Sequence, residues 1–193
     1  MSDEPTGEAV VLDVLAHGRS DDDRPRYRRQ PVAYAMGVGD FQLYELGFEA
    51  APDVAIGERI VPEAEDGPAS VRPVGYDGLS SGARAEVEYV VEEIVDEDRD
   101  RFLTFFNESQ PISLRLHQLN LLPGIGEKLR EAIIDERRRG PFVGFDDLEA
   151  RVDGLHDPRS ILIERILEEV REPDLKYYLF VGSDAVWTRA NLE

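Results

Sequence analysis

Short apolar runs separated by turn residues dominate the first 80 residues of the chain. Each run is four to eight residues long and is bounded by glycine, proline or charged residues, which is typical of β-strands. The expected strands lie at residues 9–16, 32–38, 41–48, 59–62 and 70–74. The prolines at 52, 62, 68 and 73 come too often for long helices. This half of the chain therefore predicts a small barrel or sandwich.

The apolar pattern changes to a helical period after residue 80. The expected apolar stripe of this helix consists of Val87, Tyr89, Val90, Val91, Ile94 and Val95, with charged residues on the other face. Ser80 or Ser81 is the expected N-cap of this helix. A second helix carries a run of aromatic residues, and Pro111 is expected to open a third. Their core residues are Phe102, Leu103, Phe105 and Phe106 in the second helix and Ile112, Leu114, Leu116 and Leu119 in the third.

The last third of the chain repeats a plan of helix, tight turn and helix. Further helices are expected at residues 127–139, 147–152 and 161–170, and Gly140 followed by Pro141 should end the first of these. The run 175–181 reads as a final strand that could return to the N-terminal sheet.

The patterns together predict an α+β protein with two domains. Residues 1–8 are polar and expected to be disordered, and 9–79 form the β domain. Residues 80–172 form an all-α domain in which 110–172 hold the two helical turns, and 173–193 form a C-terminal strand or tail. A chain of 193 residues is long enough for two small cores.

Acidic residues outnumber basic ones, at 41 against 22, and give a net charge of −19. Lys128 and Lys176 are the only lysines. An acidic, lysine-poor surface resembles proteins of salt-loving archaea. At about 1 M salt the Debye length is only about 3 Å, so repulsion from phosphates would be screened. Net charge therefore does not argue against a nucleic-acid partner.

Several site classes are excluded by composition. The chain has no cysteine, which removes disulfides, thiolate metal sites and cysteine nucleophiles, and its histidines at 17, 117 and 156 are dispersed. No metal site and no catalytic residue is predicted. The sequence has no run of about 18 apolar residues. We therefore expect a soluble, cytoplasmic protein without a membrane partner.

The segment 122–128, Leu-Pro-Gly-Ile-Gly-Glu-Lys, carries the most specific chemistry in the chain. Gly124 and Gly126 remove side chains where a backbone could approach a phosphate, and the helix that follows presents its first amides at that point. Anion binding of this kind needs few basic residues.

This segment resembles the helix-hairpin-helix element of DNA repair, recombination and DNA-uptake proteins. The likeness extends through Ala132, Ile133 and Gly140 to Asp146, Asp147 and Leu148. It implies that amides around Gly124 and Gly126 contact backbone phosphates, that Lys128 adds a charge-assisted bond and that Ile125 is a buried anchor. Hairpins of this family can also hold a monovalent cation on carbonyl oxygens, here at residues 123–126. No other cofactor is expected.

The second turn, residues 154–158, departs from the hairpin pattern because His156 stands where the second glycine is expected. We interpret it as a degenerate copy kept for packing.

The whole chain resembles an uncharacterised archaeal family of the DUF655 type, described as predicted nucleic-acid-binding proteins. This resemblance implies an OB-like N-terminal barrel followed by a tandem helix-hairpin-helix domain. Barrels of that kind bind single strands or looped RNA through a sheet face and its loops.

An arginine-rich loop joins the first two expected strands. It offers four guanidinium groups beside one aromatic ring, from Arg24, Arg26, Tyr27, Arg28 and Arg29. Such a loop could bind a nucleic-acid backbone and stack a base. A solvated loop neutralised by residues Asp21 to Asp23 is an equally good interpretation.

The sequence therefore predicts a non-catalytic nucleic-acid-binding protein, with RNA favoured over DNA on the strength of the barrel resemblance. A protein-interaction subunit, for instance of a ribosomal particle or a transcription or repair complex, ranks second. A DNA glycosylase using Asp146 or Asp157, or a metal nuclease using Asp174 and Lys176, ranks third. The helical domain is small for the base-receiving pocket that glycosylase chemistry needs.

Overall fold

The computed structural model describes residues 7–182, which divide into two compact units. Of these residues, unit 1 comprises 7–90 and 170–174, and unit 2 comprises 91–169 and 175–182. Most of the N-terminal segment predicted to be disordered lies outside the described residues, as do residues 183–193 of the predicted tail. The protein is of the α+β class, as the sequence predicts.

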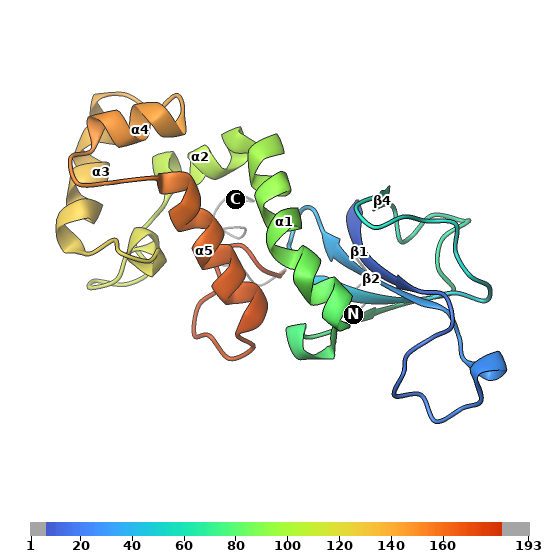
Figure 1. Cartoon of the computed structure of the whole chain (residues 1–193). Coiled ribbons are helices and arrows are strands. Elements are labelled where there is room, and N and C mark those ends of the chain that lie inside the picture. The colour runs from blue at the N-terminus through green and yellow to red at the C-terminus, as the bar shows by residue number, and fades with distance from the viewer. Residues whose placement is uncertain (1–6, 183–193) are drawn as a thin grey trace. The chain divides into compact units, whose positions relative to one another are not determined.

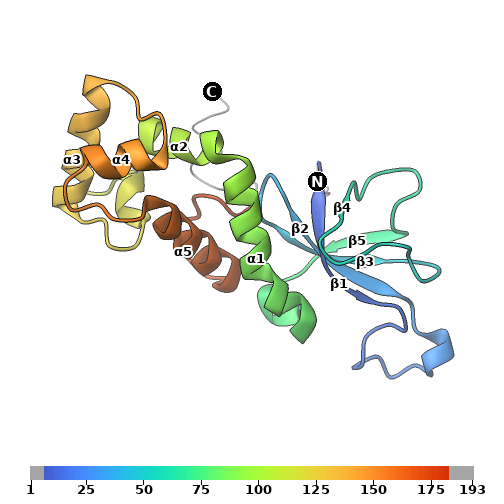
Figure 2. The same cartoon turned by 45° about the horizontal axis from the view of Figure 1, so that its top comes forward.

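Unit 1 is built on a curled antiparallel sheet of five strands (Figure 2). Its order is β4-β1-β2-β3-β5. The bounds are Ala9–Leu15 for β1, Val32–Gly37 for β2, Leu43–Gly47 for β3, Arg59–Ile60 for β4 and Ser70–Pro73 for β5. All five predicted strands are present, and the sheet forms a half-barrel. A register shift between Val11 and Asp13 adds a bulge to β1, which bends a strand and increases its twist.

One face of the sheet packs small side chains against large ones. Ala9, Ala33 and Ala35 lie beside Tyr44 and Leu46, and all five are buried. Partly buried side chains from the strands and loops complete this cluster, namely Val14, Phe48, Ile60 and Val71. Alternate residues of β2 therefore form one core, as strand periodicity requires.

The first helix is tied to the sheet by its cap. Ser80 accepts the amide of Ala83 at 3.0 Å and donates its hydroxyl to Asp13 at 2.6 Å. The prediction of an N-cap at this point is confirmed. Helix α1, Ser81–Glu97, begins there and buries Ala83, Val87 and Val90 within unit 1.

Unit 2 contains α2 (Arg99–Glu108), α3 (Glu127–Arg139), α4 (Phe145–Arg151) and most of α5 (Pro158–Arg171) (Figure 1). Phe102 and Phe105 pack against Phe180, with ring centroids 6.0 and 5.3 Å apart. The prediction that the aromatic residues of α2 belong to a core is confirmed. Helix α3 ends at Arg139, and the C-cap that follows is Gly140, whose φ of 154° favours glycine.

The predicted helix opened by Pro111 does not form. A bridge joins Pro111 to His117 instead, and only the short 3₁₀ turn η3, Gln118–Leu121, follows. The hydroxyl of Ser113 accepts the amides of Arg115 and Leu116 at 3.3 and 3.2 Å, which closes a turn in competition with a helix. The apolar residues at 112, 114 and 116 alternate, and this spacing does not suit a helix face.

The predicted final strand at 175–181 is also wrong. The amides of Leu179, Phe180 and Val181 donate to the carboxylate of Glu169 at 2.7, 2.9 and 3.0 Å. Their hydrogen bonds are satisfied by a buried side chain of α5, so this segment does not pair with a sheet.

His117 caps η3 and links stability to pH. It is 5% exposed, and its Nδ1 accepts the amide of Leu119 at 3.1 Å. Burial, helped by the charges of Arg137 and Arg130, lowers the pKa of His117 to about 4. Between pH 6.5 and about 4, this histidine is protonated in the unfolded chain but not in the folded one. The free energy of unfolding should therefore decrease as the pH falls through this range.

We expect His117→Asn, which keeps an acceptor at the cap, to remove this dependence. The stability difference between wild type and variant should shrink as the pH falls, by up to about 1.4 kcal/mol per pH unit. Urea denaturation at several pH values measures it. Parallel pH profiles of the two proteins would contradict the assignment.

Candidate nucleic-acid interface

The first hairpin is a tight turn between η3 and α3. The amide of Ile125 donates to the carbonyl of Leu122 at 3.2 Å, and Gly124 has a φ of 76°. Leu122 and Ile125 are buried, whereas Gly124 and Gly126 are exposed. The turn is therefore anchored by its apolar residues and presents its glycine backbone outward, with Ile125 in the predicted anchor position.

The side chain of Asn120 holds this turn in place. Its side-chain amide donates to the carbonyl of Ile125 at 3.3 Å, and its oxygen accepts Arg130 at 3.2 Å and the amide of His117 at 3.3 Å. One side chain thus joins η3, the turn and α3, so the hairpin is held in shape before any ligand arrives.

The start of α3 is open to an outside acceptor. Gly126 is the N-cap, and no side chain of the described residues caps the helix. The first amide bonded inside the helix is that of Arg130, which donates to Gly126 at 3.0 Å. The earlier amides need other acceptors. A Cβ added at Gly124 or Gly126 would meet nothing within 4 Å, so a ligand can approach the backbone closely.

The second hairpin begins with the same turn. The amide of Leu155 donates to Val152 at 3.2 Å, Gly154 has a φ of 86° and Leu155 is buried. Up to this point it copies residues 122–125. His156 then follows, exposed, with its Nδ1 3.8 Å from Glu149.

After His156 the two hairpins differ at the helix start. Asp157 accepts the amide of Ser160 at 3.1 Å and its hydroxyl at 2.6 Å, and these bonds lower the pKa of Asp157. The first residue of α5 is Pro158, which has no amide hydrogen. At the start of α5 the carboxylate of Asp157 thus accepts a helix amide, whereas the corresponding position at the start of α3 has no side-chain acceptor among the described residues.

The arginines that end α3 serve structure. Arg137 donates to the carbonyls of Phe106 and Ser109 at 3.0 and 2.9 Å, and burial lowers its pKa. Arg138 and Arg139 pair with Asp135 and Glu136 at 3.4 and 2.8 Å. These residues hold α2 and α3 together or pair along the helix.

In unit 1 the arginine-rich loop is only partly neutralised. Arg24 pairs with Asp22 at 2.7 Å, and this bond lowers the pKa of Asp22 to about 2. Arg29 donates to the carbonyls of Arg24 and Arg19 and so braces the loop. Among the predicted binding residues, these two are engaged within the protein.

The tip of this loop remains available. Tyr27 is 82% exposed, and the guanidinium of Arg28 lies 5.6 Å from its ring centroid. Arg26 is exposed on the same 3₁₀ turn, Arg26–Arg28. An exposed aromatic ring thus lies on the same short turn as two cations, and such a ring is a surface on which a base can stack.

A hollow of about 540 Å³ lies at the base of the loop and includes residues that sequence reasoning missed. Its cations are Arg19, Arg24 and Arg72. Arg19 and Arg72 both pair with the nearly buried Glu45, Arg19 at 2.9 Å, and the hydroxyl of Tyr34 lies 3.3 Å from the same carboxylate. Burial, with the charge of Glu45, raises the pKa of Tyr34. Arg72 lies on the edge strand β5, whose partner strand β3 is distant in the sequence. No local sequence pattern therefore indicated that Arg72 belongs to this hollow.

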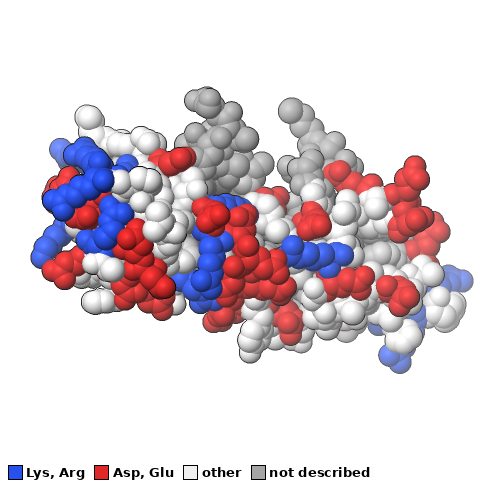
Figure 3. Space-filling model, turned by 90° about the horizontal axis from the view of Figure 1, so that it is seen from above, with Lys and Arg blue, Asp and Glu red and all other residues white. Residues whose placement is uncertain are grey.

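Most basic side chains in this acidic protein have partners. Within residues 7–182, the exceptions without a carboxylate, carbonyl or ring contact are Arg26, Arg115 and Lys128. On the face in Figure 3, acidic side chains cover much of the surface and basic ones gather over the end of unit 2 formed by α3 and α4. Two of the three exceptions flank the first hairpin in the sequence.

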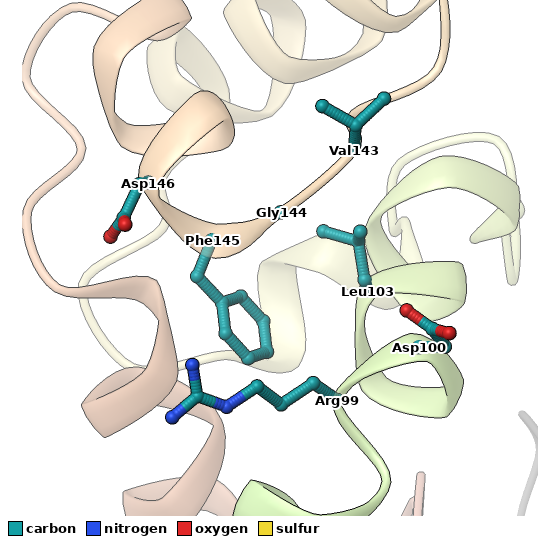
Figure 4. A pocket seen from close by; sticks show the side chains of 7 residues that line it. All are labelled: Arg99, Asp100, Leu103, Val143, Gly144, Phe145 and Asp146. Carbon is teal, nitrogen blue, oxygen red and sulfur yellow. The ribbon is translucent and has the colours of Figure 1, made fainter.

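A smaller cavity of about 250 Å³ lies between α2 and the start of α4 (Figure 4). Arg99 lies beside the ring of Phe145, and the carboxylate of Asp146 points away from both. Asp146 is one of the two aspartates, with Asp157, that the glycosylase interpretation would use, and its orientation away from the cavity does not support that interpretation.

A family model described as "Protein of unknown function (DUF655)" matches residues 6–182. The chain belongs to this family. The uncharacterized protein MJ0038 of Methanocaldococcus jannaschii is similar to it, 38% identical over 177 residues that cover 90% of this chain and 78% of that protein. The crystal structure of Af1531 from Archaeoglobus fulgidus matches with a TM-score of 0.77 and 36% identity, covering 91% of this chain and 99% of that one. The predicted DUF655 resemblance is thus confirmed, and these relatives are archaeal.

No helix within residues 7–182 is long and apolar enough to cross a membrane. In that range no group of three His, Asp or Glu side chains is placed to hold a metal ion.

Proposed function

We propose that this DUF655 protein binds nucleic acid without cleaving it, through phosphate contacts at the first hairpin. The observation that carries the proposal is the contrast between the two hairpins. The start of α5 is closed by Asp157 and Pro158, whereas the start of α3 is open at Gly126. Helix N-termini with open amides favour phosphate through both hydrogen bonding and the helix dipole.

Lys128 supplies the matching charge. It lies in the first turn of α3, is exposed and has no partner among the described side chains. A lysine at this point can add a charge-assisted bond to a phosphate that the amides already hold.

The acidic composition fits this mode of binding. We infer an origin in a salt-loving archaeon, where counterion release would contribute little to affinity. Short hydrogen bonds from fixed amides depend less on salt than a long-range basic field does. A protein of charge −19 would then need a few well-placed contacts, and the first hairpin offers them.

The tip of the arginine-rich loop provides a second contact in this proposal. Tyr27 would stack on a base while Arg26 and Arg28 meet the backbone, with Arg24 and Arg29 shaping the loop. This stacking mode suits single-stranded or looped RNA and supports RNA over DNA, as an OB-like barrel would.

A protein partner is the second candidate. Val61 and Tyr89 are exposed apolar side chains that the nucleic-acid proposal does not use. Copurification with ribosomal particles or polymerase that survives nuclease treatment would favour this candidate.

The experiment that tests the proposal compares Lys128→Ala with Arg138→Ala. Both side chains are exposed on α3, but Arg138 already pairs with Asp135. We expect Lys128→Ala to weaken binding of short RNA by about tenfold, because one charged hydrogen bond contributes about 1.5 kcal/mol or more. Arg138→Ala should change it by less than about twofold. Fluorescence anisotropy in molar salt measures both, and equal effects would count against the hairpin.

A further inference from the structure

The loop between Pro111 and His117 is a rigid projection on unit 2. Its ends are joined by the bridge between these two residues, and the amides of Ile112 and Ser113 donate to the carbonyl of Leu116 at 2.8 and 3.0 Å. The Ser113 hydroxyl accepts two further amides. Four main-chain amides of the loop are therefore hydrogen-bonded within it, and these bonds hold its shape.

The tip of this loop carries an apolar and a basic side chain in the open. Leu114 is fully exposed at 106%, the highest value among the exposed large apolar residues of the described chain. Arg115 beside it is exposed, and its guanidinium has no partner among residues 7–182. Leu114 therefore adds nothing to the core of unit 2, and the ordered loop presents it to solvent beside a cation that no group of the described residues neutralises.

The loop is built into the hairpin that we propose to bind phosphate. His117 ends the loop and caps η3, and its amide donates to Asn120, the residue that also holds Ile125 and Arg130. In Figures 1 and 2 the loop, in yellow-green, lies at the end of unit 2 where α3 begins. The loop tip and the first amides of α3 are thus held by the same set of hydrogen bonds, which centres on Asn120.

We propose that this loop is a wedge for double-stranded nucleic acid, with Leu114 inserting at a base step and Arg115 contacting the neighbouring backbone. The inference rests on the proposed phosphate contact at Gly126. Apolar side chains that enter a duplex from a groove partly unstack a base step, and adjacent phosphate contacts offset that cost. One leucine flanked by Ser113 and Arg115 is too small and too polar a surface for a protein interface, whereas it suits a wedge beside a phosphate anchor.

The test uses a short duplex RNA and a duplex DNA of the same sequence, each carrying one 2-aminopurine, and the matching single strands. Unstacking raises the fluorescence of this base. The full chain is compared with Leu114→Ser, with Gly126→Asp and with Val143→Ser, a control that alters another highly exposed apolar side chain of unit 2. None of these positions is buried, and circular dichroism checks that each variant folds.

We expect the wild type and Val143→Ser to raise the fluorescence of a duplex. Leu114→Ser should lose the fluorescence change and bind duplexes about tenfold more weakly, with single-strand binding unchanged. If Leu114→Ser behaves like the wild type while Gly126→Asp weakens all binding, the wedge is wrong and the hairpin contact stands. If Gly126→Asp changes nothing, both are wrong.

Discussion

Gly126→Asp is expected to weaken nucleic-acid binding by at least about 100-fold, because it removes two or more charge-assisted amide contacts of about 1.5 kcal/mol each. The new carboxylate would accept the first amides of α3 itself, as Asp157 does at the start of α5. It would also repel a phosphate at close range. The second hairpin is thus the natural model for this variant.

The same substitution should leave the fold intact or stabilise it slightly. A Cβ at position 126 meets nothing within 4 Å, and the φ of −86° is open to any residue. Replacing a glycine N-cap by aspartate contributes a few tenths of a kcal/mol. Thermal denaturation and RNA binding are measured together on both proteins. Loss of binding with unchanged or higher stability is expected, and binding equal to the wild type would contradict the assignment.

Glu169→Gln is expected to destabilise unit 2 by about 3 kcal/mol or more, the usual cost of removing one partner of a buried ion pair. The Glu169 side chain is fully buried and accepts Arg165 at 2.8 Å as well as the amides of Leu179, Phe180 and Val181. Glutamine would leave Arg165, whose side chain is 8% exposed, without its buried carboxylate. Its amide group would also face main-chain donors.

Glu168→Gln is the matched control for this prediction. Glu168 pairs with the same arginine at 3.1 Å, but its side chain is 45% exposed. Exposed pairs contribute at most about 1 kcal/mol, so its loss should be small. Urea denaturation followed by circular dichroism measures both variants. Equal losses would show that Glu169 does not hold the segment that follows α5.

Local signals explain which parts of the fold could be predicted from the sequence. Helix α3 runs from Glu127 to Arg139 as expected, because the glycine turn before it and Gly140 after it both act within one helical turn. The five strands were recognisable because turn residues bound each apolar run. Ser80 was predictable as a cap for the same reason, since its bond to Ala83 spans three residues.

Non-local bonds explain the errors. The segment 175–181 has strand composition, but Glu169, from a helix ten residues earlier, takes its amides. Leu114 looked like a core residue until the bridge between Pro111 and His117 placed it at a loop tip. Errors like that at Leu114, where an apolar residue proves not to be in the core, tend to occur at functional sites, because such a residue is kept for a reason other than packing.

The candidate site shows the same division. Gly124, Gly126 and Lys128 could be selected from the motif alone, because the turn that places them is local. The sequence could not show which arginines are free to meet a ligand. That depends on ion pairs such as Arg24 with Asp22 and on partners distant in the sequence, such as those of Arg137. The structure narrows the exposed cations without a partner in the described range to Arg26, Arg115 and Lys128.

The most direct test of phosphate binding at the first hairpin is an NMR titration of the ¹⁵N-labelled protein with short RNA in molar salt. The two hairpins provide an internal comparison within one spectrum. We expect the amide signals of Gly126, Glu127 and Lys128 to shift as phosphate accepts their hydrogens, while those of His156, Asp157 and Arg159 stay in place. Shifts confined to the second hairpin, or absent from residues 126–128 under conditions where RNA is bound, would contradict the account.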